Sequence, residues 1–147
     1  MIKFKQLPEN VLERIPLLSE KLREENNISA MYLFGSALNG FINPLSDIDI
    51  AVLLDKSINR NKFFDEYLKI FGIAADLLNI DELDLVILNE APVRIAHNIL
   101  KTGKLLFSND PAQLAEFIEV NFKLYPDFMF YKNQYNAEFH KQIGLLQ

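Results

Sequence analysis

The feature that most constrains the fold is the segment 47–54, in which two aspartates lead into an unbroken apolar run. Successive side chains of a β-strand point to opposite faces, and beyond residue 50 both series are apolar. A strand that is apolar on both faces is buried between two layers of structure. The segment therefore predicts a core strand whose acidic end lies where the sheet meets solvent.

The two aspartates of this strand, Asp47 and Asp49, occupy alternate positions. Their side chains are expected on one face, roughly 6 to 7 Å apart along the backbone. Carboxylates at that separation can converge on Mg²⁺, which prefers oxygen ligands. The same spacing also fits a strand with one solvated face, so this pattern alone leaves both interpretations open.

Two further stretches favour the metal site. Gly35 and Ser36 follow a predicted strand, where glycine permits close approach to the backbone and free N–H groups favour phosphate. Segment 81–88 is a second strand that is apolar on both faces and carries an acid near its beginning. Asp84 is thus the natural third carboxylate, and Asp81, in the preceding turn, is its rival.

Composition limits the classes of protein. The chain has 147 residues, half of them hydrophobic, which predicts one globular domain with a substantial core. The formal net charge of -5 disfavours DNA or RNA as the main partner. Because cysteine is absent, disulfides and thiolate metal sites are excluded. No signal peptide or apolar stretch of membrane-spanning length is evident, so we expect a cytosolic protein that does not enter membranes.

Periodicity and turn residues predict the element order. Helices are expected at 9–26, 63–78, 93–102 and from 111 onward, and strands at 28–34, 46–54, 81–88 and 104–107. Pro126 is expected to divide the last helical region. We predict a catalytic domain at 1–110 and a helical extension at 111–147 that packs on it. The extension is rich in aromatic residues, which could serve as core or as an interface: Phe117, Phe122, Tyr125, Phe128, Phe130, Tyr131, Tyr135 and Phe139.

Several basic residues could bind phosphate, and spacing does not choose among them. Arg60 and Lys62 lie in a polar loop, where solvation is the commoner role. Three more cations lie in the helix predicted at 93–102 and the strand predicted at 104–107: Arg94, Lys101 and Lys104. His97 in the same helix is expected to be a packing or surface residue and not a metal ligand.

Gly35-Ser36, Gly40 and Ser46-Asp47-Ile48-Asp49 together resemble the active-site signature of the polymerase-beta-like nucleotidyltransferases, in particular the minimal nucleotidyltransferase (MNT) family. The resemblance covers residues 10–110. It implies an α/β (α+β) fold, a small mixed sheet flanked by helices. Many minimal nucleotidyltransferases carry a basic residue just before the second glycine, but this chain has Asn39.

The resemblance also implies a function. Asp47, Asp49 and Asp84 would hold two Mg²⁺ ions, while Gly35, Ser36 and Ser46 would bind the nucleotide. The expected reaction is AMP transfer from ATP, with release of pyrophosphate, to a tyrosine of a HEPN-domain ribonuclease toxin. This would make the chain the antitoxin of a toxin–antitoxin pair, and the two proteins could form a hetero-oligomer. The alternatives are transfer to a small hydroxylated acceptor such as an aminoglycoside, and an antitoxin that neutralises by binding alone.

Overall fold

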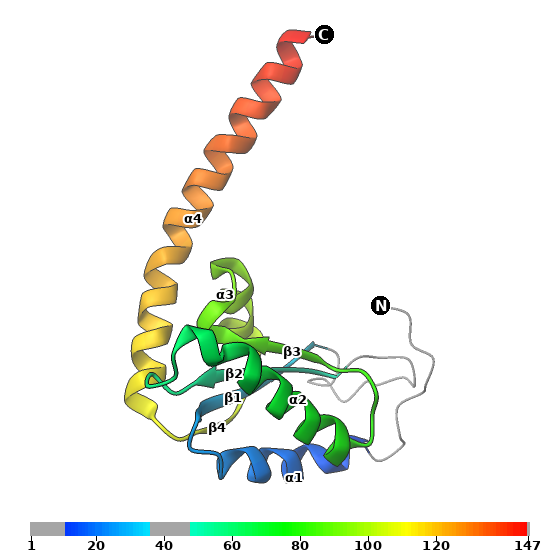
Figure 1. Cartoon of the computed structure of the whole chain (residues 1–147). Coiled ribbons are helices and arrows are strands. Elements are labelled where there is room, and N and C mark those ends of the chain that lie inside the picture. Colours follow the sequence, from blue (N-terminus) through cyan, green and yellow to red (C-terminus); the bar gives the residue numbers. More distant parts are fainter. Residues whose placement is uncertain (1–10, 36–47, 147) are drawn as a thin grey trace.

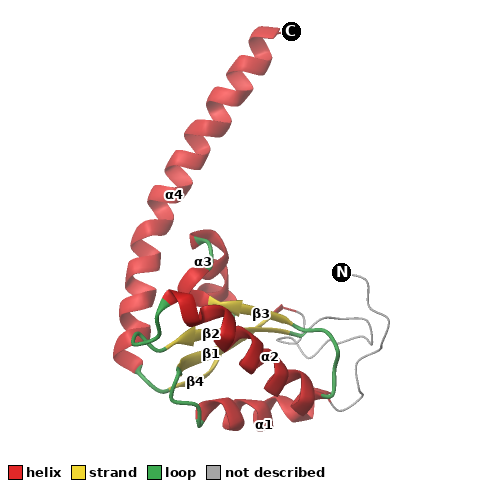
Figure 2. Ribbon diagram, viewed as in Figure 1, coloured by secondary structure: helices red, strands yellow, loops and turns green. Residues whose placement is uncertain are grey.

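The computed structural model describes residues 11–35 and 48–146, and these form a four-stranded sheet with helices on both faces (Figures 1 and 2). The strands are β1 (Ile28–Phe34), β2 (Asp49–Leu54), β3 (Asp84–Ile87) and β4 (Lys104–Ser108), in the spatial order β3-β2-β1-β4. β1 pairs antiparallel with β2 and with β4, and β2 pairs parallel with β3. The expected small mixed sheet is confirmed.

Helices α1 (Val11–Arg23) and α2 (Phe63–Leu78) cover one face of the sheet. Their apolar stripes bury one side of the central strands, including Met31, Ile50 and Val52. α1 continues through Pro16, and α2 ends at Asn79, whose left-handed backbone terminates the helix. A short 3-10 helix, η2 (Arg60–Lys62), precedes α2.

The opposite face of the sheet is covered by α3 (Val93–Thr102) and by the first part of α4 (Pro111–Leu146). Here Ala30, Tyr32, Ala51 and Leu53 of the two central strands pack against Ile99 of α3. A second 3-10 helix, η3 (Leu88–Glu90), joins β3 to this layer. Both faces of β1 and β2 are therefore covered, which confirms the burial predicted from their apolar runs.

α4 is one helix of 36 residues, so the prediction that Pro126 divides it is wrong. Its first part packs on α3, where the rings of Tyr125 and His97 stack with a centroid distance of 3.7 Å. Beyond that contact the helix extends away from the domain (Figure 1). Pro126 thus marks the point where α4 leaves the domain, and the missing backbone N–H is accommodated within a continuous helix.

The packing of His97 agrees with the expectation from sequence. Its Nδ1 lies 3.2 Å from Asn121 Oδ1, and the Asn121 amide donates to the Val93 carbonyl oxygen over 3.2 Å. The ring of Phe122 lies 4.6 Å from that of His97. These contacts hold α4 to α3. No helix in the described part of the chain is both long and apolar enough to cross a membrane.

Candidate active site

Two of the predicted carboxylates are brought together by the pairing of β2 with β3. Asp49 is the register partner of Asp84, and the Asp84 N–H donates to the Ile48 carbonyl oxygen over 2.8 Å. Neighbouring strands lie about 4.7–4.9 Å apart, and register partners in a parallel pair project to the same face. Both residues are half-buried. The first positions of two adjacent strands therefore present their carboxylates side by side.

Alternation along β2 identifies the face on which these carboxylates lie. Ala51 and Leu53 share the parity of Asp49, and both pack in the layer formed with α3 and α4. Asp49 and Asp84 are the first residues of β2 and β3, so their carboxylates lie at one end of that sheet face. They also line a cavity of about 540 Å³ beside the edge strand β3. This is within the size range of small-molecule sites, about 300–1,000 Å³.

Gly35 is required by the position of Asp49. Its φ of +78° lies in the left-handed region, which L-residues other than glycine rarely adopt. A Cβ atom at this position would overlap Asp49 Oδ2 and would lie 2.8 Å from Asp49 Cγ. Glycine therefore lets the end of β1 approach the carboxylate directly.

The remaining predicted site residues, Ser36, Ser46 and Asp47, lie outside the described residues, as does Asn39. Within residues 11–35 and 48–146 no group of three metal-ligating side chains gathers. Asp81, the rival of Asp84, is exposed and lines the same cavity.

Glu82 lines this cavity too, and sequence reasoning overlooked it. Its Oε2 is buried without a hydrogen-bond partner in the described part of the chain. The available signal was its place beside Asp84 at the start of an apolar strand.

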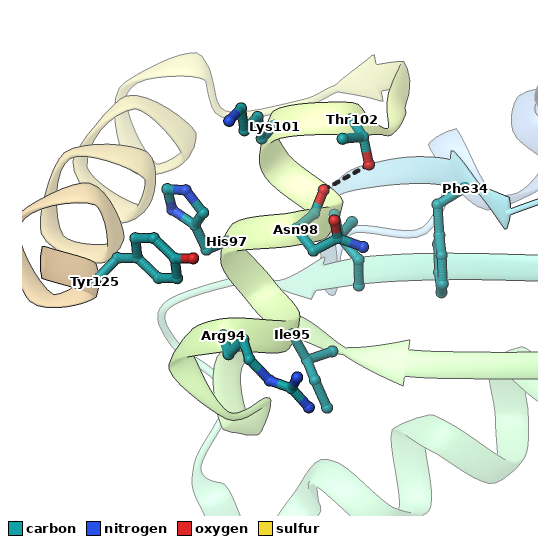
Figure 3. Close-up of a pocket in the computed structure, with 9 residues that line it drawn as sticks. Phe34, Arg94, Ile95, His97, Asn98, Lys101, Thr102 and Tyr125 are labelled. Carbon is teal, nitrogen blue, oxygen red and sulfur yellow. Dashed lines mark hydrogen bonds between the residues drawn. The ribbon is translucent and has the colours of Figure 1, made fainter. Parts of the chain in front are cut away.

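The structure separates the candidate phosphate-binding cations. Arg94 and Lys101 line a second cavity of about 540 Å³, together with Asn98 and Phe34 (Figure 3). Lys104 lies instead in a groove lined by residues of α1, on the opposite face of the sheet.

Arg60 and Lys62 form η2, which follows the end of β2 distant from Asp49. This placement gives no support to phosphate binding by either residue.

Comparison with known proteins supports the interpretation of this arrangement. Residues 17–112 match the family described as "Polymerase beta, Nucleotidyltransferase". The protein adenylyltransferase MntA of Aphanizomenon flos-aquae is 31% identical over 118 residues, which cover 71% of this chain and 78% of the relative.

Solved structures agree with this assignment. One chain of a toxin–antitoxin crystal structure with AMP-PNP superposes with a TM-score of 0.62 at 25% identity, covering 86% of this chain and 96% of that chain. An MNT antitoxin in complex with the tri-AMPylated HEPN toxin of Shewanella oneidensis shares the fold, with a TM-score of 0.58 at 22% identity, and the match covers 83% and 95% of the two chains.

The family match spans more than half of the chain, and it includes both carboxylates and the glycine that contacts one of them. The chain belongs to the polymerase-beta nucleotidyltransferase family.

Proposed function

We propose that this chain is an antitoxin that transfers AMP from ATP to a tyrosine hydroxyl of a HEPN-domain ribonuclease toxin and thereby silences it. The observation that carries the proposal is the pairing of Asp49 with Asp84 at the first positions of β2 and β3, with Gly35 against the first carboxylate. The relatives add support, because one is a protein adenylyltransferase and others are antitoxins in complex with their toxins. The cytosol is its expected location.

The residues present fit the metal that this chemistry uses. Asp49 and Asp84 offer hard oxygen ligands from adjacent strands, which suits Mg²⁺. Together with Asp47, whose expected role comes from the sequence, they would hold two ions. Such ions, when bound, stabilise charge on the attacking and leaving oxygens and lower the pKa of the attacking hydroxyl.

The chain's own residues orient the reactants. The tyrosine oxygen attacks the α-phosphorus of ATP, a phosphodiester bond forms, and the bond to the β-phosphate breaks to release pyrophosphate. Asp84 accepts the phenolic proton, since it lies on the edge strand beside a cavity open to an acceptor. Gly35 and Ser36 bind the outgoing phosphates through backbone N–H and hydroxyl groups, and Ser46 supports the nucleotide.

The part of α4 beyond the domain is a suitable docking element for the partner. Phe128, Phe130 and Tyr131 are exposed there, whereas Phe117 and Tyr125 pack on the domain. The aromatic extension thus serves as core in its first part and exposes an apolar surface further along. Exposed aromatic residues are enriched at protein interfaces, and the toxin would cover this segment.

Substitution of the carboxylates tests the proposal. Asp49→Asn and Asp84→Asn should each abolish label transfer from α-³²P-ATP and Mg²⁺ to the purified toxin, because the amide cannot replace a carboxylate as metal ligand or base. Asp76→Asn, an exposed change on α2, serves as the matched control and should retain full activity.

Ribonuclease assays of the toxin complete the experiment. If the Asn variants still protect RNA substrates as well as the parent does, neutralisation occurs by binding alone and the catalytic proposal is wrong. Failure of the parent protein to label the toxin would also overturn it.

A further inference from the structure

We propose that Arg94 and Lys101 of α3 form a binding site for the polyphosphate of ATP, reached from the carboxylates across Phe34. The inference rests on the proposed function and identifies which cations of the chain bind the nucleotide. We name the cavity that these side chains line the α3 cavity; Figure 3 shows it, with Arg94 and Lys101 toward opposite ends of the helix and Asn98 between them.

The α3 cavity adjoins the carboxylate site. Phe34 lines both cavities, and it is the register partner of Asp49. Because partnered strands lie about 4.7–4.9 Å apart, the α3 cavity begins about one strand away from Asp49. Phe34 also directly precedes Gly35. Among the described residues, Phe34 is therefore the one that a molecule bound at the carboxylates and along Gly35 would pass to reach α3.

The charge of the α3 cavity selects an anion. The described residues that line it include two cations and no carboxylate. In the described part of the chain neither Arg94 nor Lys101 forms an ion pair, and both side chains are exposed. They are seven positions apart, about 10 Å along the helix axis, and both side chains are long enough to converge on one anion. Asn98 adds an amide donor between them.

Calorimetric titration of the full chain with AMP-PNP and Mg²⁺ tests this inference. The double variant Arg94→Gln/Lys101→Gln should bind AMP-PNP about tenfold more weakly or worse, since each exposed cation contributes about three- to fivefold. Adenosine, which has no phosphate, should bind both proteins equally. Lys104→Gln is the matched control, because it removes an exposed cation from the opposite face.

A charge-conserving variant, Arg94→Lys/Lys101→Arg, should keep the AMP-PNP affinity within threefold of the parent. For the neutral variant, Arg94→Gln/Lys101→Gln, an unchanged melting temperature would show that the protein still folds. Unchanged AMP-PNP affinity in the neutral variant would overturn the inference; if transfer to the toxin then fell, the α3 cavity would bind the acceptor. An equal loss for adenosine and AMP-PNP would overturn it as well. If the parent protein binds no AMP-PNP, the proposed function itself fails.

Discussion

Gly35→Ala is the substitution whose effect follows most directly from the structure. The left-handed backbone at this position costs an alanine about 1–2 kcal/mol. In addition, the new Cβ would overlap the Asp49 carboxylate, whose nearer oxygen must withdraw by roughly 1.5–2 Å to regain ordinary contact distances of about 3.5–4.0 Å. Overpacking of this kind adds about 1–3 kcal/mol. We therefore expect a destabilisation of about 2–5 kcal/mol.

The effect of Gly35→Ala on activity should exceed its effect on folding. A displacement of about 1 Å at a reacting group can reduce the rate about 100-fold. We therefore expect transfer of label from ATP to the toxin to fall by at least that factor, under conditions where urea titration shows that the variant is folded. The alanine alters no side chain that takes part in chemistry, so the loss would report the positions of the Asp49 carboxylate and of the Gly35 N–H group.

Gly72→Ala is the matched control for this experiment. Gly72 lies exposed in α2, and a Cβ there meets no atom within 4 Å. The change should stabilise the protein by about 0.5–1 kcal/mol and leave activity unchanged. The assigned contact between Gly35 and Asp49 is wrong if Gly35→Ala keeps more than a third of the parent's activity and its free energy of unfolding lies within about 0.5 kcal/mol of the parent's.

Three further predictions concern stability. Asn89→Ala should lower the free energy of unfolding, measured by urea titration, by about 1–3 kcal/mol. The Asn89 side chain accepts a hydrogen bond from the Leu54 N–H over 2.8 Å and donates one to the Leu54 carbonyl oxygen over 3.0 Å. A loss below about 0.5 kcal/mol would contradict this prediction. Burial raises the pKa of Tyr32, so above pH 10 the folded state binds more protons than the unfolded state, and stability falls as pH rises. Tyr32→Phe should therefore reduce the fall in melting temperature between pH 8 and 11. Equal slopes for the variant and the parent would contradict this prediction. His97→Ala removes the ring stack on Tyr125 and should lower the free energy of unfolding by about 1–2 kcal/mol. Amide hydrogen exchange in the first part of α4 should become faster. Unchanged exchange there would show that other contacts hold the helix.

Much of the fold is encoded in local patterns. The strand Ile28–Phe34 and the helices Phe63–Leu78 and Val93–Thr102 have the predicted bounds. Two strands are shorter than expected: β2 begins at Asp49 and β3 spans only Asp84–Ile87. At the end of β3 the difference arises because Leu88 begins the 3-10 helix η3, so the apolar run continues there without remaining a strand.

The outcome at Gly103 shows how a correct expectation can have a different physical cause. Gly103 directly follows the helix predicted at 93–102, as expected of a glycine that ends a helix, and α3 does end at Thr102. Gly103 has an extended backbone with a φ of -73°, so no left-handed conformation requires glycine. A Cβ there would crowd the Ile99 carbonyl oxygen, which accepts from the Gly103 N–H over 2.7 Å. The requirement comes from packing.

Sequence alone determined that acids would lie at the start of strands buried on both faces, because the alternation of side chains along a strand is local. It also indicated the family, through the spacing of Gly35, Ser36, Asp47 and Asp49. Only the tertiary structure decided that Asp49 and Asp84, 35 positions apart, become register partners, since the crossover through α2 sets that pairing. Only the tertiary structure also decided which cations lie near the carboxylates. Arg94 and Lys101 lie on the same face of the sheet as Asp49 and Asp84, whereas Lys104 lies on the opposite face, beside α1.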